Sequence, residues 1–214
     1  MSLREELNAL GQDLTARIPD HVLSIIRDAS ATLAHSDLAE QALKAGDKAP
    51  DFTLPSLDGE NLGLSALLND GPVVISFYRG GWCPYCNLEM QALQRALPAI
   101  EQAGGQLIAM APEQPEHAAQ TRDKGNLTFP ILHDRDNGVA KAFGLVFTLP
   151  DMLRPVYEGF GIDLEESQGN DRFELPVPGT YIIRPDGVIA SAFVDVDYTQ
   201  RMEPASIVEV LKIL

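Results

Sequence analysis

The sequence predicts an α/β fold in which helices flank a central β-sheet, with a helical extension at the N-terminus. From residue 73 onward, short apolar stretches rich in β-branched residues alternate with longer stretches of helical periodicity, the pattern of a layered α/β domain. Two glycines end the first apolar stretch, and a proline directly after Cys83 opens a long amphipathic segment. The chain has 214 residues, 45% of them hydrophobic, which is enough for one sizeable core.

The N-terminal part of the chain has helical periodicity. Apolar residues recur three and four positions apart over 3–14 and again over 22–33, and a third short helix is expected over 36–45. We therefore divide the chain into a helical extension, residues 1–45, and a main domain, residues 46–214. The apolar stripe of the extension either packs on its own domain, which we favour, or forms a dimer or partner interface.

The main domain is expected to alternate strands and helices. In chain order we expect an extended segment over 50–55, an Asp-Gly turn at 58–59, a helical turn over 64–68, a strand from Val73, a helix over about 84–103, a strand at Gln106–Ala111, a helix near Pro115–Lys124, a strand near Phe129–Leu132, a helix from Asp134 to Phe143, a hairpin of Thr180–Ile183 with Val188–Val194, and a last helix over about Pro204–Leu214. Residues 145–176 have no clear pattern, and they form either an insertion next to a functional site or a surface excursion.

The only two cysteines of the chain, Cys83 and Cys86, lie where the first strand of the main sheet gives way to a helix. Cys83 falls at the start of that helix, where unpaired N–H groups and the positive end of the helix dipole stabilise a thiolate and lower the pKa of the thiol. Cys86 lies one turn further on the same side, close enough for a disulfide. Gly80 and Gly81 give the backbone freedom beside the reactive sulfur. The spacing therefore predicts a thiol redox site.

Two alternatives for the cysteine pair are less favourable. A pair of buried structural thiols is not expected at a strand-to-helix turn that follows a tryptophan. A zinc site needs two further ligands, and the four histidines are scattered along the chain without paired spacing. We therefore expect neither a metal nor an organic cofactor.

The residues around the cysteines allow more than one role. Trp82 and Tyr85 either shape a hydrophobic rim for a substrate or partner, or Trp82 covers the disulfide while Tyr85 is exposed. The segment after the last hairpin also holds a polar cluster, made of Asp195, Asp197, Tyr198 and Arg201. For this cluster we favour a structural network over a catalytic one.

The composition argues against several classes of partner. The formal net charge is −15, and such an acidic protein is a poor partner for nucleic acid, which binds concentrated Lys and Arg. No stretch approaches the roughly 20 apolar residues of a membrane span, and the first residues lack the apolar core of a signal peptide. A chain with only two cysteines is more typical of a reducing compartment. We expect a cytoplasmic protein that binds neither nucleic acid nor membranes.

Three stretches of the sequence resemble one known family. They are Gly46–Phe52 (GDKAPDF), the strand that runs into Cys83, and Thr180–Gly187 (TYIIRPDG), and together they are similar to the peroxiredoxins over about residues 46–214. Within that family the sequence resembles the bacterial peroxiredoxin-like branch, whose members carry Trp-Cys-Pro-x-Cys. The resemblance implies a thioredoxin-like fold, with Cys83 as the peroxidatic cysteine and Cys86 as the candidate resolving cysteine.

The sequence departs from the peroxiredoxin pattern at three positions. The family has a proline seven residues and a threonine three residues before the cysteine, and these positions are Ser76 and Gly80 here. Pro178 replaces the arginine that precedes Thr180 by two residues. The segment from Pro178 to Thr180 is instead similar to the cis-proline turn of thioredoxins, displaced by one residue.

These residues and the resemblance together predict a thiol peroxidase. Cys83 would attack hydrogen peroxide or an organic hydroperoxide and become a sulfenic acid, and Cys86 would condense with it to an intramolecular disulfide. Thioredoxin or another thiol, such as glutathione, would restore the dithiol. Arg79 can supply a positive charge beside Cys83, although no family motif places it there. The supporting candidates are Arg79, Trp82, Gly80, Pro178 and Thr180.

Two other functions fit the same cysteine motif. The protein could be a thioredoxin-like thiol–disulfide oxidoreductase that exchanges the same pair with protein disulfides. It could also be a redox-sensing binding module that is oxidised without rapid recycling.

Overall fold

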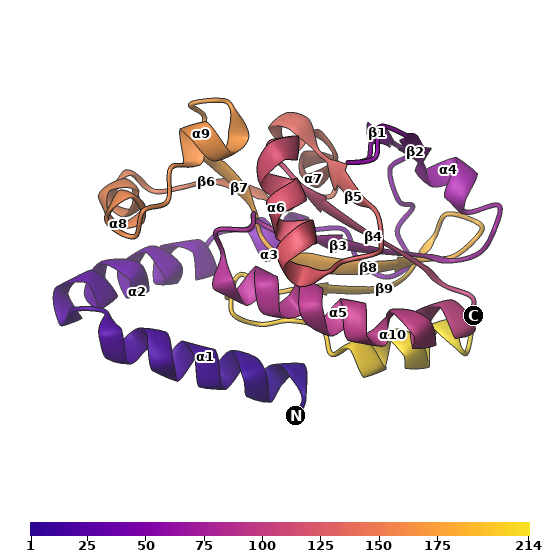
Figure 1. The fold of residues 1–214 in the computed structure, drawn as a ribbon, viewed down its shortest axis with the longest axis horizontal. Helices are drawn as coiled ribbons and strands as arrows, with labels where there is room; N and C mark the ends of the chain where they lie inside the picture. Colours follow the sequence, from indigo (N-terminus) through magenta and orange to yellow (C-terminus); the bar gives the residue numbers. More distant parts are fainter.

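The computed structural model describes residues 1–214 and has at its centre a five-stranded sheet of order β5-β4-β3-β8-β9 (Figure 1). Its strands are β3 (Val73–Phe77), β4 (Gln106–Ala111), β5 (Ile131–His133), β8 (Gly179–Ile183) and β9 (Ile189–Val194). β3 pairs in parallel with β4 and antiparallel with β8, so the strand that precedes the cysteines is the central one. The predicted α/β fold class is confirmed.

Both faces of β3 are buried, which explains its continuous apolar sequence. Val74 packs into the cluster formed by α5 (Pro84–Gln102) and α10 (Pro204–Leu211), two helices that cover the same face of the sheet (Figure 1). The residues on either side of Val74 point to the opposite face, where they pack with α4 (Leu64–Leu67) and α7 (Gly138–Ala142). A short loop, residues 78–83, leads from the end of β3 to the start of α5.

Most boundaries predicted for the main domain agree with the structure to within one or two residues. α5 ends one residue before the expected position, β4 has the expected bounds, and α6 spans Pro115–Gly125. β5 begins two residues later than expected, and α10 ends at Leu211 rather than Leu214. The extended segment and the Asp-Gly turn are also present, as the small antiparallel pair β1 (Thr53–Pro55) and β2 (Asn61–Gly63).

The N-terminal residues form α1 (Leu3–Arg17), α2 (Asp20–Ala34) and α3 (Leu38–Gln41), the last shorter than expected. The apolar side of α1, which begins with Leu3 and Leu7, packs into the same cluster as α5. α2 packs instead on the segment around the 3-10 helix η2 (Asp151–Leu153). The apolar stripe therefore packs on its own chain, as we favoured. The division of the chain at residue 45 stays a prediction.

The single helix predicted from Asp134 to Phe143 is wrong. The chain forms a 3-10 turn, η1 (Arg135–Asn137), and only then α7. Asp136 and Asn137 have φ of 59° and 57°, in the left-handed region that interrupts an α-helix. The Asp134 carboxylate accepts hydrogen bonds at 2.8 Å from the N–H groups of Val139 and Ala140, so it caps a helix that begins later than the apolar pattern suggests.

Residues 145–176, whose pattern was unclear, contain four short elements besides η2. They are β6 (Val146–Thr148), α8 (Arg154–Gly159), α9 (Leu164–Gln168) and β7 (Glu174–Pro176), with β6 and β7 antiparallel. We call residues 145–176 the excursion. It projects from the sheet and carries α8 above α2 in Figure 1.

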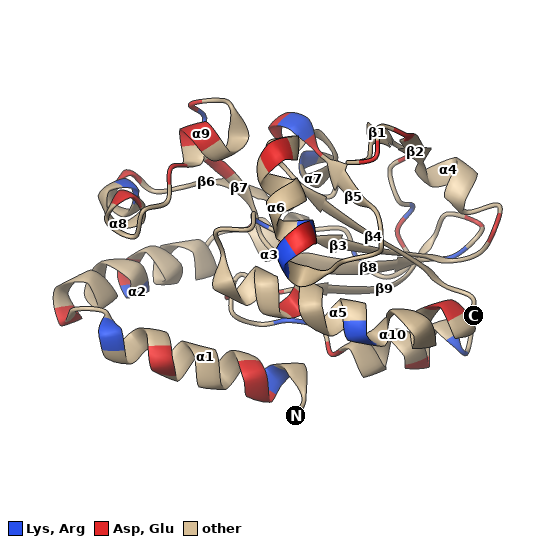
Figure 2. Cartoon of the chain, in the orientation of Figure 1, with Lys and Arg blue, Asp and Glu red and all other residues tan.

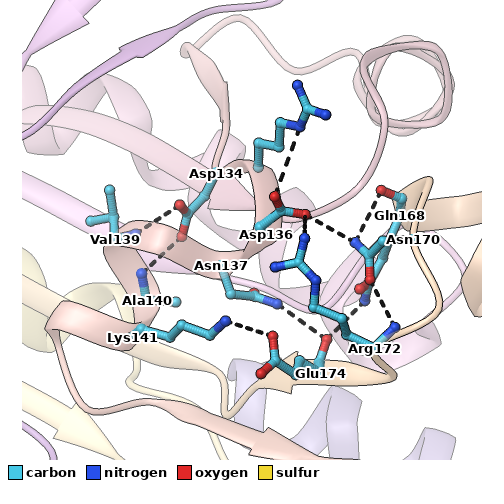
Figure 3. A network of polar contacts seen from close by, with 11 residues as sticks. Asp134, Asp136, Asn137, Val139, Ala140, Lys141, Gln168, Asn170, Arg172 and Glu174 are labelled. Carbon is cyan, nitrogen blue, oxygen red and sulfur yellow. Dashed lines mark hydrogen bonds and ion pairs between the residues drawn. The ribbon is translucent and has the colours of Figure 1, made fainter.

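A polar network fixes the end of the excursion to the main domain (Figure 3). Arg172 forms an ion pair with Asp136 at 2.8 Å, and Lys141 forms one with Glu174 at 2.6 Å. The side-chain amide of Asn137 also donates to the Glu174 carbonyl oxygen at 3.1 Å. The broken helix at η1 is therefore an attachment point of the excursion.

Charged residues lie over most of the helices, and Asp and Glu outnumber Lys and Arg by 31 to 16 (Figure 2). Basic residues occur singly among acidic ones rather than in a continuous stripe (Figure 2). None of the helices combines the length and the apolar character that crossing a bilayer requires.

Candidate active site

The loop between β3 and α5 brings Cys83 to the N-terminus of the helix. Cys83 is the N-cap residue of α5, with extended backbone angles (φ −90°, ψ 111°), and Pro84 occupies the first turn. The Cys83 N–H donates to the Gly80 carbonyl oxygen at 3.1 Å, and the Asn87 N–H donates to the Cys83 carbonyl oxygen at 3.1 Å. The backbone therefore places Cys83 at the start of the helix, where the sequence led us to expect it.

The two glycines of the loop are required by close approaches of side chains. Gly80 has φ of +147°, and a Cβ there would lie 2.4 Å from the indole Nε1 of Trp82. A Cβ on Gly81 would lie 1.9 Å from the Thr121 hydroxyl oxygen. The Gly81 N–H also donates to both carboxylate oxygens of Glu113 at 3.0 Å, which anchors the loop to the segment after β4.

The two sulfurs are buried, and their surroundings shift the pKa values of the two thiols in opposite directions. Cys83 and Cys86 are free thiols, 2% and 0% exposed. The pKa of Cys83 is lowered to about 6, first because Cys86 donates a hydrogen bond to its sulfur, and then because Arg79 and Arg201 favour the anion against the cost of burial. Burial and the bond to Cys83 raise the pKa of Cys86 well above its ordinary value. One sulfur is therefore a thiolate near neutral pH, and the other stays a thiol.

The helix terminus contributes less to the Cys83 thiolate than we expected from the sequence. Its contribution comes through one N–H group, that of Cys86, and is smaller than those of the Cys86 thiol and of the two arginines. The sequence correctly indicates a lowered pKa, but the main cause is the second cysteine.

Arg79 is a buried cation without a carboxylate partner. It is 4% exposed, and none of the ion pairs of the structure includes it. Its guanidinium donates to the Tyr157 hydroxyl, and its carbon Cζ lies 4.9 Å from the ring centroid of Trp82 and 4.7 Å from that of Tyr198. Aromatic rings thus hold the guanidinium in place, and its charge favours the thiolate of Cys83.

Aromatic rings form the walls around this cation. Trp82 and Tyr157 meet edge to face with centroids 5.5 Å apart, and Tyr85 and Tyr198 do so at 5.6 Å. Tyr85 is 8% exposed, so the alternative in which this side chain faces solvent is wrong. Trp82 is half-buried and covers both Gly80 and Arg79.

Arg201 belongs to the site, although the sequence placed it in a structural cluster. Its guanidinium forms a buried ion pair with Glu89 and donates a hydrogen bond to the Cys86 sulfur at 3.4 Å. Burial raises the pKa of Glu89 to about 7, while Arg201 acts in the opposite direction. The two acids of the predicted cluster, Asp195 and Asp197, accept hydrogen bonds only from residues of their own turn.

Pro178 and Thr180 lie at the start of β8, at the edge of the sheet from which the loop leaves β3. Gly179 pairs with Phe77 and Thr180 with Ser76 in the antiparallel register. Both candidates are buried, and neither side chain makes a hydrogen bond with a cysteine. Every peptide bond of the structure is trans, so the similarity to a cis-proline turn is wrong in its geometry.

Three residues of the site were not predicted from the sequence. Tyr157 comes from α8 in the excursion, where no pattern marked it. Glu113 follows β4 and reaches back to the loop. Glu89 carried a signal that could have been used, because it is an acid one turn after Cys86 on the side of α5 that also buries Met90.

A polar cavity of about 460 Å³ lies beside the cysteine loop. Its walls come from α5, α6 and the excursion, and they include Gly81, Trp82, Asn87 and Glu113. Asn87 and Met90, which also line it, follow Cys83 at four- and seven-residue spacing, on the side of the helix that Cys83 begins. Nowhere do three His, Cys, Asp or Glu side chains gather in a way that suits a metal ion.

Comparison with known proteins gives a consistent picture. The family model described as the AhpC/TSA family matches residues 45–192. A putative peroxiredoxin of Mycobacterium tuberculosis is 38% identical over 102 residues, which cover 48% of this chain and 64% of that protein. This chain thus matches less than two thirds of the length of that relative. Peroxiredoxin Bcp of Escherichia coli is 32% identical over 117 residues, covering 55% of this chain and 74% of the relative.

A second kind of relative and a solved structure complete the comparison. Thiol-disulfide oxidoreductase ResA of Halalkalibacterium halodurans is 32% identical over 127 residues, covering 58% of this chain and 71% of that protein. The crystal structure of peroxidoxin BcpB from Mycobacterium tuberculosis superposes with a TM-score of 0.63 at 21% identity, over 80% of this chain and 98% of the other. That likeness supports the thioredoxin-like fold.

Proposed function

Because this chain belongs to the AhpC/TSA family, the peroxiredoxins, we propose that it is a thiol-dependent peroxidase acting on hydrogen peroxide or organic hydroperoxides. The observation that carries the proposal is the pairing of the two cysteines at the start of α5. The pKa of Cys83 is lowered to about 6 while Cys86 stays protonated. One sulfur is therefore a nucleophile at neutral pH, and the other is a thiol ready to condense with the oxidised product.

In the first step the Cys83 thiolate attacks one oxygen of the peroxide. A sulfur–oxygen bond forms, the O–O bond breaks, and the departing hydroxide or alkoxide takes up a proton and leaves as water or alcohol. Charge develops on that departing oxygen, so a positive group fixed beside it lowers the barrier. Arg79 is the group we assign to this task, since its Nε–H has no hydrogen-bond partner in the protein.

The supporting residues hold Arg79 and the loop in position. Trp82 packs against the guanidinium, and Gly80 leaves the space that the indole ring fills. Thr180 pairs with Ser76 in the strand that leads to the loop, and Pro178 directly precedes β8. In this assignment the role of the threonine and arginine that the sequence lacks passes to Arg79.

In the second step the Cys86 sulfur attacks the sulfur of the Cys83 sulfenic acid. A disulfide forms, the sulfur–oxygen bond breaks, and the hydroxyl leaves as water with the proton that Cys86 gives up. An external thiol then reduces the disulfide. We propose thioredoxin, or a small thiol such as glutathione, as this reductant, and a reducing compartment such as the cytoplasm as the location. A homodimer finds no support in α1, whose apolar side packs on the chain's own α5 cluster.

A second candidate function rests on one observation, the similarity to the thiol-disulfide oxidoreductase ResA. The same two cysteines would then exchange with a protein disulfide, and peroxide would be incidental. We favour the peroxidase because the family match covers residues 45–192 and the pair is almost fully buried, which admits a small peroxide more readily than a protein disulfide.

The proposal is tested by the products of one oxidation cycle. One equivalent of hydrogen peroxide should give a protein two hydrogens lighter, with Cys83 linked to Cys86. In Cys86→Ser the same treatment should leave a sulfenic acid on Cys83 that dimedone traps. Steady peroxide consumption with a thioredoxin system should follow in the wild type. Disulfide-linked dimers as the main wild-type product would contradict the assignment of Cys86.

A further inference from the structure

Arg201 lies inside the protein between one carboxylate and one sulfur. Its Nε donates to the Glu89 carboxylate, and its Nη2 donates to the Cys86 sulfur at 3.4 Å. Its Nη1 donates to the carbonyl oxygens of Tyr198 at 2.5 Å and of Gln200 at 2.7 Å. Four hydrogen bonds from three nitrogens fix a planar guanidinium in one orientation, which a lysine ammonium could not reproduce.

Stability alone gives no reason for this buried ion pair. Both side chains are 2% exposed, and a buried pair contributes little compared with apolar residues of the same volume, because both charges lose their hydration. The helix around Glu89 is otherwise apolar where it faces the core, with Met90 and Leu93 nearly inaccessible. A pair kept at such a site, with one end on a redox sulfur, points to a role in the chemistry.

The direction of the hydrogen bonds identifies that role. A guanidinium has donors only, so the Cys86 sulfur must be the acceptor in its contact with Arg201. The thiol proton of Cys86 is therefore not used in that contact, and Cys86 donates it to the Cys83 sulfur. The four groups form one chain, in which Arg201 donates both to Glu89 and to Cys86, and Cys86 donates to Cys83.

We infer that Arg201, held by Glu89, is a positioning residue for Cys86 in both steps of the redox cycle. In the reduced protein it fixes Cys86 as the donor that stabilises the Cys83 thiolate. During resolution Cys86 loses its proton to the departing hydroxyl of the sulfenic acid, which leaves as water, and the Arg201 guanidinium stabilises the negative charge that develops on the attacking sulfur. This inference rests on the proposed peroxidase function.

The two partners of the ion pair should affect Cys86 in opposite directions. Arg201 favours the Cys86 thiolate, whereas Glu89 and Cys86 disfavour each other's negative charge. The opposite signs follow from the opposite charges of the two groups, so the rate of disulfide closure is the measurement that reports on positioning. The other ionisable groups that face the two sulfurs are Tyr78, Arg79, Tyr85, Glu113, Tyr157 and Tyr198.

The test titrates Cys86 alone and then measures disulfide closure. In a Cys83→Ser background, thiolate absorbance at 240 nm reports the pKa of Cys86. Arg201→Met should raise this pKa by about one unit or more, and Glu89→Gln should lower it. In the protein with both cysteines, Arg201→Met should slow closure after one equivalent of peroxide by roughly tenfold to a hundredfold, the range for losing a hydrogen bond to a charged group, and should leave more sulfenic acid for dimedone.

Two further variants sharpen the comparison. Arg201→Lys keeps the positive charge but not the planar set of donors. The pKa of Cys86 should therefore stay close to its value with Arg201, while disulfide closure stays slow. Arg95→Gln removes an arginine of α5 that is paired with Glu6 at 2.9 Å near the surface, and it should change neither measurement. Should Arg201→Met fail to fold, as near-ultraviolet circular dichroism would reveal, the downward shift in Glu89→Gln carries the test.

The inference is overturned if neither Arg201→Met nor Glu89→Gln shifts the pKa of Cys86, or if Arg201→Met closes the disulfide as fast as the wild type. Failure of the peroxidase proposal would look different. Wild-type Cys83 would then react with peroxide no faster than a simple thiol. The Cys86 titration, and closure driven by the oxidant diamide in place of peroxide, would still report on Arg201.

Discussion

The Arg79 guanidinium donates a hydrogen bond to the Tyr157 hydroxyl, and this contact joins the cysteine loop to the excursion over residues 145–176. The two residues are 78 positions apart in the chain. Without the excursion, the cation beside Cys83 would lose its hydrogen-bond acceptor and one of its aromatic walls. The excursion, whose sequence pattern was the least clear, is therefore part of the site.

We expect the reduced wild type to show a thiolate transition near pH 6 that is absent in Cys83→Ser. The pKa of Cys83 is lowered to about 6 by the Cys86 thiol and by the two arginines. Absorbance at 240 nm against pH measures the transition directly. A transition of the same midpoint in Cys83→Ser would assign the nucleophile to Cys86 instead.

The same shift predicts how stability depends on pH. The folded pKa of Cys83 lies below its unfolded value, so the thiolate contributes stability that is fully present above the unfolded pKa and is lost as pH falls through about 6. The difference in melting temperature between reduced wild type and Cys83→Ser should therefore grow in favour of the wild type from pH 6 toward pH 9. Thermal melts under reducing conditions at several pH values measure it.

Arg79→Met should raise the pKa of Cys83 by about one unit and slow its reaction with peroxide by roughly tenfold or more. Tyr157→Phe is the matched variant, because it removes only the hydroxyl that accepts the Arg79 hydrogen bond. It should leave the charge in place and cost about 1–3 kcal/mol of stability through the unpaired donor. Rapid-mixing measurement of Cys83 oxidation and denaturant unfolding check the two variants. An unchanged peroxide rate in Arg79→Met would reduce Arg79 to a packing role.

The sequence predicted those parts of the site that lie close together in the chain. The strand, the glycines, Cys83, the proline and Cys86 follow one another within β3 and α5, and each has a conformational reason visible in the chain. Arg201 and Cys86 are 115 positions apart, and only the folding of the segment after β9 onto α5 brings them together. A polar residue next to a strand end looks the same whether it faces solvent or sulfur. The only local signal of that contact was the position of Glu89, an acid on the side of α5 that also carries Met90.

The broken helix at η1 shows the same limit in the fold. Residues 134–143 have the spacing of one helix, although Asp136 and Asn137 are residue types that enter the left-handed region more readily than most and the Asn-Gly pair is a turn signal. The helical spacing gives no sign of the ion pair between Asp136 and Arg172, which comes from the far end of the excursion.

Gly80→Ala should displace Trp82 and destabilise the protein by about 1–3 kcal/mol, because alanine is strained at φ of +147° and its Cβ would meet the indole ring. The chain has a single tryptophan, so its fluorescence reports the displacement directly. Gly159→Ala is the control, since a Cβ there would meet nothing within 4 Å. An unchanged emission spectrum and stability in Gly80→Ala would mean that the indole does not need the space over Gly80.

The last prediction separates peroxidase from disulfide reductase, which share the Cys83 nucleophile and so cannot be told apart by cysteine variants. A peroxidase must stabilise charge on a small departing oxygen, and the buried Arg79 is placed for that. A disulfide reductase must admit a partner's disulfide, yet Cys83 is only 2% exposed, and Trp82, Tyr157 and Tyr198 surround the Arg79 guanidinium that acts on it. We therefore expect the second-order rate of Cys83 with hydrogen peroxide to exceed that of a simple thiol of matched pKa, and its rate with a protein disulfide to be low. Truncating the wall with Tyr157→Ala should raise the disulfide rate and lower the peroxide rate. Brisk disulfide reduction by the wild type, with a peroxide rate no better than that of the simple thiol, would establish the reductase instead.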